Sequence, residues 1–218
     1  TITFNNETAA ANQDLIFAAA SKTTDAKLTQ NPGKVGFTFN HMLSRVRFTF
    51  ANGFGAGSNI TLKVYDVTIT DAYATAELAV ADGAPAAAWT KFGATFSKNF
   101  GQVGGATLAT LTDEGVTDEG ATVSAATEHF YLIPADKAYN VTFNVTLFQA
   151  GVQLDTYERT ATIPASNMQK GMSYDIKTTL NAQNTSDDGQ LYPIEFVVTD
   201  VAEWDTFGDG DITGAVNQ

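Results

Sequence analysis

Apolar and polar residues alternate along most of this chain, with the two-residue period of β-strands. The alternation is most regular in residues 34–50, where apolar side chains fall on odd positions up to Phe39 and on even positions from Val46. A regular strand cannot change phase without turning its apolar side chains to the wrong face. We therefore predict a break or bulge near residues 41–44.

The same pattern predicts further strands, separated by turns rich in Gly, Pro and Asn. Residues 59–70 form one strand with a bulge near residues 64–66, and residues 138–148 and 152–163 form a hairpin. The other predicted strands are residues 1–5, 128–133, 172–180 and 190–204.

Two stretches have a less definite pattern. Residues 15–20 suit either a strand or a helical turn, and residues 101–127, with few large apolar side chains, suit a long loop or a hairpin. About eight or nine short strands and no convincing amphipathic helix predict an all-β fold with essentially no helix. We expect a β-sandwich of antiparallel strands.

The last predicted strand, residues 190–204, follows a strongly polar linker, residues 181–189. The linker has almost nothing to bury, so we expect a flexible surface segment. Alternation places Ile194 and Phe196 on one face of the strand, and Pro193 marks a strand entrance or a sheet edge because it cannot donate to a central ladder. A tethered edge strand can complete the sheet of another chain. The simpler alternative is that it is the last strand of its own sandwich.

Composition narrows the function classes. The chain has 218 residues, of which 44% are hydrophobic, enough for one large β domain or two small ones. It has no cysteine, which excludes disulfides, thiolate metal sites and a cysteine nucleophile. The formal net charge of −12 argues against a nucleic-acid partner, and no apolar run is long enough to span a membrane. We take Thr1 as a cut end that follows a removed or omitted targeting segment.

The sequence contains few residues that are candidates for catalysis or for binding a ligand. The two histidines, His41 and His129, lie in different predicted strands, and no hydrolase elbow, P-loop or dinucleotide-binding pattern occurs. The sequence therefore predicts no catalytic residue, no cofactor and no metal site. Aromatic residues between Trp89 and Phe100 are candidates for stacking a sugar ring, although packing in a core explains them more simply.

The order of four motifs resembles the fimbrillin family, the subunits of type V pili and related surface fimbriae. The motifs are VGFTFNHMLSRVRFTF, then EHFYLIP with the hairpin NVTFNVTLFQAG, then MQKGMSYDIKTTL, then PIEFVVTDVAEW. The earlier run QDLIFAAA also resembles the segment that precedes the F-x-H strand in fimbrillin-like proteins. The similarity extends from about Gln13 to Trp204.

The resemblance implies a chain of two transthyretin-like β-sandwich domains. By this resemblance, residues 1–33 would be the C-terminal remnant of an N-terminal β domain and its linker. Residues 34–218 would be a C-terminal transthyretin-like β-sandwich with a tethered last strand. The larger part of the N-terminal domain would then lie outside this chain.

The resemblance also implies a route of assembly. Such subunits are exported as lipoproteins to the outer membrane, and a trypsin-like protease removes an N-terminal strand and leaves an apolar groove. A C-terminal strand of the next subunit fills this groove and builds a head-to-tail polymer. The matching residues of the candidate donor strand here are Leu191, Ile194, Phe196, Val198, Val201 and Trp204. The lipid-anchored cysteine and the protease site would lie outside this chain.

We therefore expect a structural or adhesive fimbrial subunit, not an enzyme, on the surface of a Gram-negative bacterium. Its partners would be other pilin subunits and a ligand on a host or bacterial surface, and it would contact the outer membrane only through a lipid anchor of the precursor. The alternative is a monomeric carbohydrate-binding or adhesin β-sandwich at the cell surface. A glycoside hydrolase, the third class, requires two carboxylates that face each other across a cleft.

Overall fold

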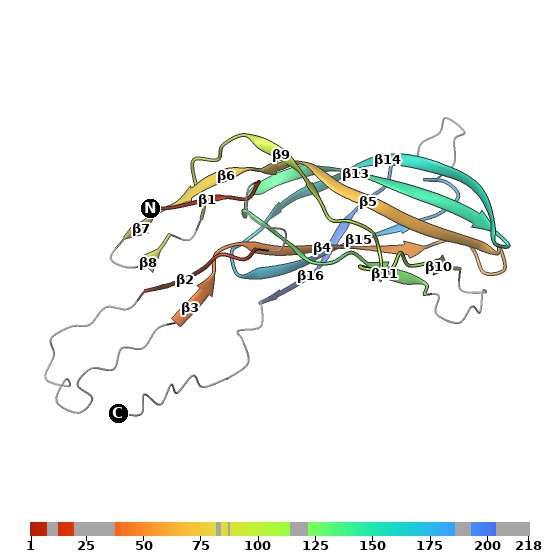
Figure 1. Cartoon of the computed structure of the whole chain (residues 1–218), viewed down its shortest axis with the longest axis horizontal. Coiled ribbons are helices and arrows are strands. Elements are labelled where there is room, and N and C mark those ends of the chain that lie inside the picture. Colours follow the sequence, from red (N-terminus) through yellow and green to blue (C-terminus); the bar gives the residue numbers. More distant parts are fainter. Residues whose placement is uncertain are drawn as a thin grey trace, which may run out of the picture.

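The computed structural model describes residues 1–7, 13–19, 38–81, 84–86, 88–113, 122–185 and 193–203. These residues form sixteen strands and contain no helix, and hence no helix that could span a membrane. Most of the strands belong to two five-stranded sheets, which Figure 1 shows as two layers. The prediction of an all-β sandwich is confirmed, whereas its transthyretin-like topology stays a prediction.

The first sheet has the strand order β10–β5–β13–β14, with β9 also beside β5. Its strands are β5 (Ile60–Tyr73), β9 (Thr95–Asn99), β10 (Leu111–Thr112), β13 (Asp136–Gln149) and β14 (Val152–Asn167). The second sheet has the order β11–β4–β15–β16, with β12 also beside β4. Its strands are β4 (Ser44–Asn52), β11 (Ser124–Ala126), β12 (Phe130–Leu132), β15 (Met172–Leu180) and β16 (Val197–Glu203).

One strand pair departs from the expected antiparallel arrangement. β15 runs parallel to β4, in register from Ser173 opposite Arg45 to Leu180 opposite Asn52. The other pairs of named strands are antiparallel, including the predicted hairpin of β13 and β14. Alternation identified β4 and β15 as strands, but it carries no information on the direction in which two distant strands meet.

Both predicted interruptions of the strand pattern are present. Met42 and Leu43 separate β3 (Thr38–His41) from β4, at the position where the apolar phase changes. Within β5, Asp66 has a φ of 54°, and the ladder with β13 shifts register between Thr142 and Asn144. The break and the bulge let both long strands keep their apolar side chains facing the core.

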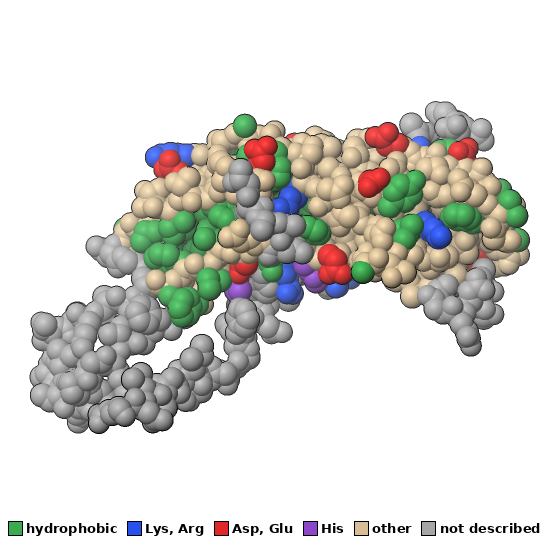
Figure 2. Space-filling view, viewed as in Figure 1, with side chains coloured by type: hydrophobic (Ala, Val, Ile, Leu, Met, Phe, Trp, Pro, Cys, Tyr) green, Lys and Arg blue, Asp and Glu red, His purple; other side chains and the backbone are tan. Residues whose placement is uncertain are grey.

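A second apolar cluster lies at one end of the sandwich. Two small sheets surround it: β1 (Ile2–Asn5) pairs with β6 (Thr75–Leu78), and β2 (Ile16–Ala19) pairs with β3. The buried side chains of the cluster are Phe4, Met42, Leu43, Ala76, Leu78, Trp89 and Ile133. Figure 2 shows hydrophobic side chains gathered at this end of the molecule. The undecided stretch at residues 15–20 thus includes a strand, β2.

A contact between Asp14 and His41 joins two of the motifs that resemble fimbrillins. His41 Nδ1 lies 2.6 Å from Asp14 Oδ2, and the amide N–H of Met42 donates to the carbonyl oxygen of Leu15 at 2.8 Å. These bonds hold β2 against β3, so that Phe17 packs on the second cluster. The domain boundary predicted between residues 33 and 34 lies outside the described residues and stays a prediction.

Two loop expectations differ from the structure. Residues 101–127, expected to be a long loop or a hairpin, contribute the short strands β10 and β11, which pair with β5 and β4. The predicted flexible linker begins with an ordered turn, in which the Asn184 side chain accepts from the Asn181 amide at 2.8 Å. Asn184 and Thr185 are buried. Their polar side chains tolerate burial because asparagine and threonine can form hydrogen bonds with the backbone of a tight turn. The rest of the linker, residues 186–189, lies outside the described residues.

Candidate strand-exchange site

The end of the described chain, residues 193–203, is named here the exchange segment. Its strand β16 pairs with β15 from Met172 opposite Glu203 to Lys177 opposite Val197. The ladder shifts register once, between Asp175 and Ile176. Among the described strands, β16 has a partner on one side only and is the edge of the second sheet. Residues 197–203 of the exchange segment are therefore attached to the second sheet along a single short ladder.

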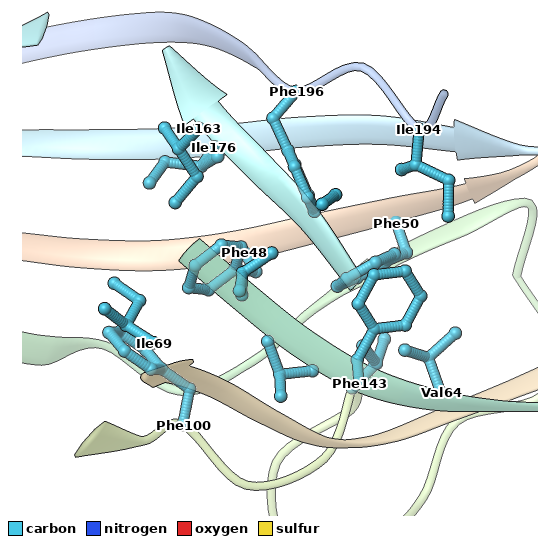
Figure 3. Packing of buried hydrophobic residues seen from close by; sticks show 14 of the residues in the cluster. Phe48, Phe50, Val64, Ile69, Phe100, Phe143, Ile163, Ile176, Ile194 and Phe196 are labelled. Atoms are coloured by element: carbon cyan, nitrogen blue, oxygen red, sulfur yellow. The ribbon is translucent and has the colours of Figure 1, made fainter. Parts of the chain in front are cut away.

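The exchange segment inserts large side chains between the two sheets. Ile194 is 7% exposed and Phe196 3% exposed, and Val198 packs against the same core. The Phe196 ring lies edge-on to Phe48 and Phe50, with centroid distances of 5.7 Å and 6.0 Å. Figure 3 shows Phe196 and Ile194 pointing from the edge of the sheet into the core.

Both sheets contribute to the surroundings of Phe196. Phe48 and Phe50 come from β4 in the second sheet, and Phe143 comes from β13 in the first, with its ring centroid 6.3 Å from that of Phe196. Edge-to-face aromatic pairs stabilise a core beyond the effect of buried area. Phe196 is therefore a core residue of both sheets, although it is carried by an edge segment.

The backbone of Glu195 connects the edges of the two sheets. Glu195 forms a parallel bridge with Thr162 of β14, and its carbonyl oxygen accepts from the Thr178 hydroxyl of β15 at 2.8 Å. The exchange segment therefore closes the side of the sandwich between β14 and β15. We name this binding place the home groove, defined by Phe48, Phe50 and Phe143 inside and by Thr162 and Thr178 at its rims.

The candidate donor residues divide into three groups. Ile194, Phe196 and Val198 face the core as the alternation predicted. The backbone of Val201 lies opposite Tyr174 in the ladder with β15, whereas Leu191 and Trp204 lie outside the described residues. In the structure the segment lies in its own sheet, and its donation to another subunit stays a prediction. The sequence did not identify the residues that contact Phe196, because alternation shows that a side chain faces the core but not which residues pack against it.

A polar network holds β15 to β4 on the outer face of the second sheet. Asp175 is buried, and its carboxylate accepts from Arg47 Nη2 at 2.8 Å and from the Thr49 hydroxyl at 2.6 Å. Arg47 and Thr49 belong to β4, and the network accompanies the parallel ladder between the two strands. This attachment of β15 does not involve the exchange segment.

The edge of the first sheet at β9 differs from the edge of the second sheet at β16, because it carries a charged side chain that faces the core. Lys98 lies on β9 opposite Ile69 and therefore on the core-facing side of the sheet. Its Nζ lies 6.0 Å from the ring centroid of Phe96 and 5.9 Å from that of Phe130, and burial lowers the pKa of the ammonium group. An inward-facing charge on an edge strand opposes pairing with another chain. This edge is therefore less suited to strand addition than the edge at β16.

His129 gives a pH-dependent prediction. Burial lowers the pKa of His129 below 6.5, and the positive charges of Arg45 and Arg47 lower it further, against the opposing effects of Asp175 and Glu128. The unfolded chain therefore binds a proton more readily, and the contribution of His129 to stability is lost progressively as the pH falls below 6.5 and through the lower pKa of the folded state. We expect urea unfolding to show a smaller loss of stability below this pH in His129→Gln than in the wild type. Equal losses in both proteins would contradict the prediction.

The proposed sugar-stacking aromatics are mostly part of the core. Trp89 is 3% exposed, and its Nε1–H donates to the carbonyl oxygen of Met42 at 2.7 Å. Phe100 is also buried, whereas Phe92 is partly exposed and stacks on Tyr73 at a centroid distance of 4.4 Å. Trp89 thus offers no face to a ligand. The described residues also contain no group of three or more side chains placed to bind a metal ion.

The fold and the site together define a β-sandwich protein whose core is closed by the last described segment of the chain, residues 193–203. The sequence model of the fimbrillin-like family matches residues 1–199. The chain therefore belongs to the fimbrillin-like family, as the motif order indicated. A comparison with curated proteins found no match.

Two solved structures from Bacteroides species are similar to this chain. A fimbrial protein from Bacteroides vulgatus superposes with a TM-score of 0.56 at 13% identity, over 81% of this chain and 59% of its own. A candidate cell adhesion protein from Bacteroides ovatus gives a TM-score of 0.37 at 15% identity, over 87% of this chain and 60% of its own. At such identities the first similarity supports the fold alone. The chain spans about three fifths of the length of either protein.

Proposed function

We propose that this protein is a structural or adhesive subunit of a cell-surface fimbria and assembles by donating residues 191–204 to another subunit. The observation that carries the proposal is that Ile194 and Phe196, both core side chains, belong to an edge segment. Membership of the fimbrillin-like family and the similar fold of the Bacteroides vulgatus fimbrial protein support it.

The physical basis of donation is that an edge strand makes the same interactions in either subunit. Main-chain hydrogen bonds to β15 supply affinity, and the alternating side chains Ile194, Phe196 and Val198 fix the register. A one-residue slip would turn these side chains to solvent. Transfer to a second subunit therefore keeps the buried area and changes only which chain supplies it.

The remaining parts of the proposal follow from this role. The protein acts as a building block, not as a catalyst, in a head-to-tail polymer of pilin subunits. The precursor reaches the outer membrane of a Gram-negative bacterium as a lipoprotein, and the fibre presents a ligand-binding surface to a host or to other bacteria. The competing function is a monomeric carbohydrate-binding or adhesin β-sandwich at the cell surface.

The test uses the full-length precursor, trimmed with a trypsin-like protease and run unheated on an SDS gel. We expect a ladder of resistant oligomers from the wild type and its loss in Phe196→Ala, since this change removes the ring buried between the two sheets. A single monomer band from the wild type under all assembly conditions would contradict strand donation and favour the monomeric adhesin.

Two control variants separate assembly from folding. Val197→Ala changes a neighbouring side chain that is 55% exposed, so the ladder should remain. Trp89→Ala removes an aromatic ring from the second cluster, which is separate from the core cluster that contains Phe196. It should lower stability and leave the ladder. Loss of the ladder in Trp89→Ala as well would show that assembly reports general stability and not the segment.

A further inference from the structure

We propose that a surface depression beside the bulge of β5 binds a neutral saccharide and is an adhesive surface of the protein. The inference rests on the proposed function and specifies the class of ligand for its adhesive role. The depression has a volume of about 440 Å³, a size typical of sites for small molecules. The strand orders place it on the side of the sandwich away from the exchange segment.

Three parts of the chain form the walls of the depression. The bulge of β5 belongs to the first sheet, Phe130 of β12 belongs to the second, and the loop after β9 joins them. The loop is bonded to the first sheet, because the Val67 amide donates to the carbonyl oxygen of Gly101 at 2.9 Å. It is bonded to the second sheet through the Gly104 amide, which donates to the carbonyl oxygen of Ala126 at 2.8 Å. Walls fixed in this way lose little freedom when a ligand binds, which favours affinity.

Phe130 and Leu108 give the depression an apolar wall. Both side chains are half-buried, so each keeps an exposed part. The Phe130 ring is held edge-on to the buried ring of Phe100, with the two centroids 5.2 Å apart. The C–H face of a sugar ring is apolar and packs on aromatic rings, whose faces carry partial negative charge. This wall therefore suits a saccharide, whereas the buried Trp89 does not.

The polar side chains of the depression offer hydrogen-bond acceptors that lack donors. The Glu128 carboxylate has no hydrogen-bond or ion-pair partner in the part of the chain that the structure describes. Gln102 donates from Nε2 to the carbonyl oxygen of Gly105 at 3.0 Å, which leaves its side-chain oxygen as an acceptor. No lysine or arginine is among the described residues that line the depression. A saccharide supplies the missing donors, because each of its hydroxyl groups can donate a hydrogen bond.

Charge restricts the ligand to neutral saccharides. Asp66 and Glu128 both line the depression, and the chain carries a formal net charge of −12. A sialylated or sulfated saccharide would bring a further negative charge to this surface, and like charges across an interface repel. A basic peptide is the other class that the two carboxylates would attract. The apolar wall and the Gln102 amide favour a sugar ring, because its C–H face and its hydroxyl groups match both.

The test uses the purified full chain on an array of neutral oligosaccharides of hexoses and N-acetylhexosamines. The array also carries their sialylated and sulfated forms and a lysine-rich peptide. We expect binding to neutral saccharides that changes little on addition of salt, because salt screens only the attraction between charges. Binding confined to the acidic saccharides or to the lysine-rich peptide would overturn the inference, as would the absence of binding to any spot.

Substitutions test whether binding occurs at the depression. Glu128→Gln should weaken binding of the neutral oligosaccharides at least about tenfold, because a charged acceptor is replaced by a neutral one. Glu158→Gln is its matched control, since Glu158 is exposed on β14 and lies outside the depression. Phe130→Leu should also weaken binding, whereas Phe96→Leu, which changes another ring packed partly buried against the core, should not. Equal effects of each variant and its control would overturn the inference.

The SDS-resistant ladder separates this inference from the proposed assembly, because it requires no saccharide. A ladder without binding of any neutral saccharide would overturn the inference and leave strand donation standing. Binding of neutral saccharides that is lost in Glu128→Gln, without a ladder from the wild type, would support the inference and contradict strand donation.

Discussion

Replacing Phe196 with alanine is expected to lower the free energy of unfolding by about 3–5 kcal/mol, the usual cost of removing a buried aromatic ring. Phe196 is 3% exposed and contacts three phenylalanine rings from both sheets. Its loss leaves a cavity beside the rings of Phe48, Phe50 and Phe143. Urea unfolding of the monomer, followed by circular dichroism, measures the effect.

The neighbouring residue Val197 provides the matched control. Its side chain is 55% exposed, so Val197→Ala should change stability by no more than about 0.5 kcal/mol. Equal stabilities of Phe196→Ala and Val197→Ala would mean that the exchange segment does not close its own sandwich in solution. The home groove would then require a different occupant.

Replacing Asn52 with aspartate is expected to destabilise the protein by about 3–5 kcal/mol, the range for a buried charge without a partner. Asn52 is buried at the end of β4, and its Nδ2 donates to the carbonyl oxygens of Ile60 at 2.9 Å and Leu111 at 3.0 Å. Ile60 and Leu111 belong to the other sheet. A carboxylate cannot donate, and it would face two carbonyl oxygens instead.

Asn99→Asp is the matched control for the change at Asn52. Asn99 is exposed, and its side-chain oxygen accepts from the Gly101 amide, a role that a carboxylate keeps. We expect a change within about 0.5 kcal/mol for Asn99→Asp. The loss in Asn52→Asp should shrink in acid, because a protonated carboxyl can again donate a hydrogen bond. A pH-independent loss would contradict this explanation.

The elements that the sequence predicted best are those with a local cause. Alternation located β4, the break at Met42 and Leu43, and the hairpin of β13 and β14, because side-chain direction alternates along any strand whatever its neighbours are. The apolar phase change before Val46 required an interruption, and Asp66 supplies the second one. These features depend only on residues that are close in the chain.

The candidate site could be predicted only in part. The apolar face of Ile194, Phe196 and Val198 and the polar residues before it were readable from the sequence. The ordered turn at Asn184 was not, because a polar stretch has the same composition whether its side chains bond to water or to its own backbone.

By itself the sequence determined that this protein is an all-β member of the fimbrillin-like family with an apolar-faced last strand. The tertiary structure alone decided that β15 runs parallel to β4 and that Phe196 lies between Phe48, Phe50 and Phe143. The physical reason is that strand order, direction and core contacts join residues far apart in the chain. They depend on the fit of whole surfaces, whereas periodicity records only which side of each strand is apolar.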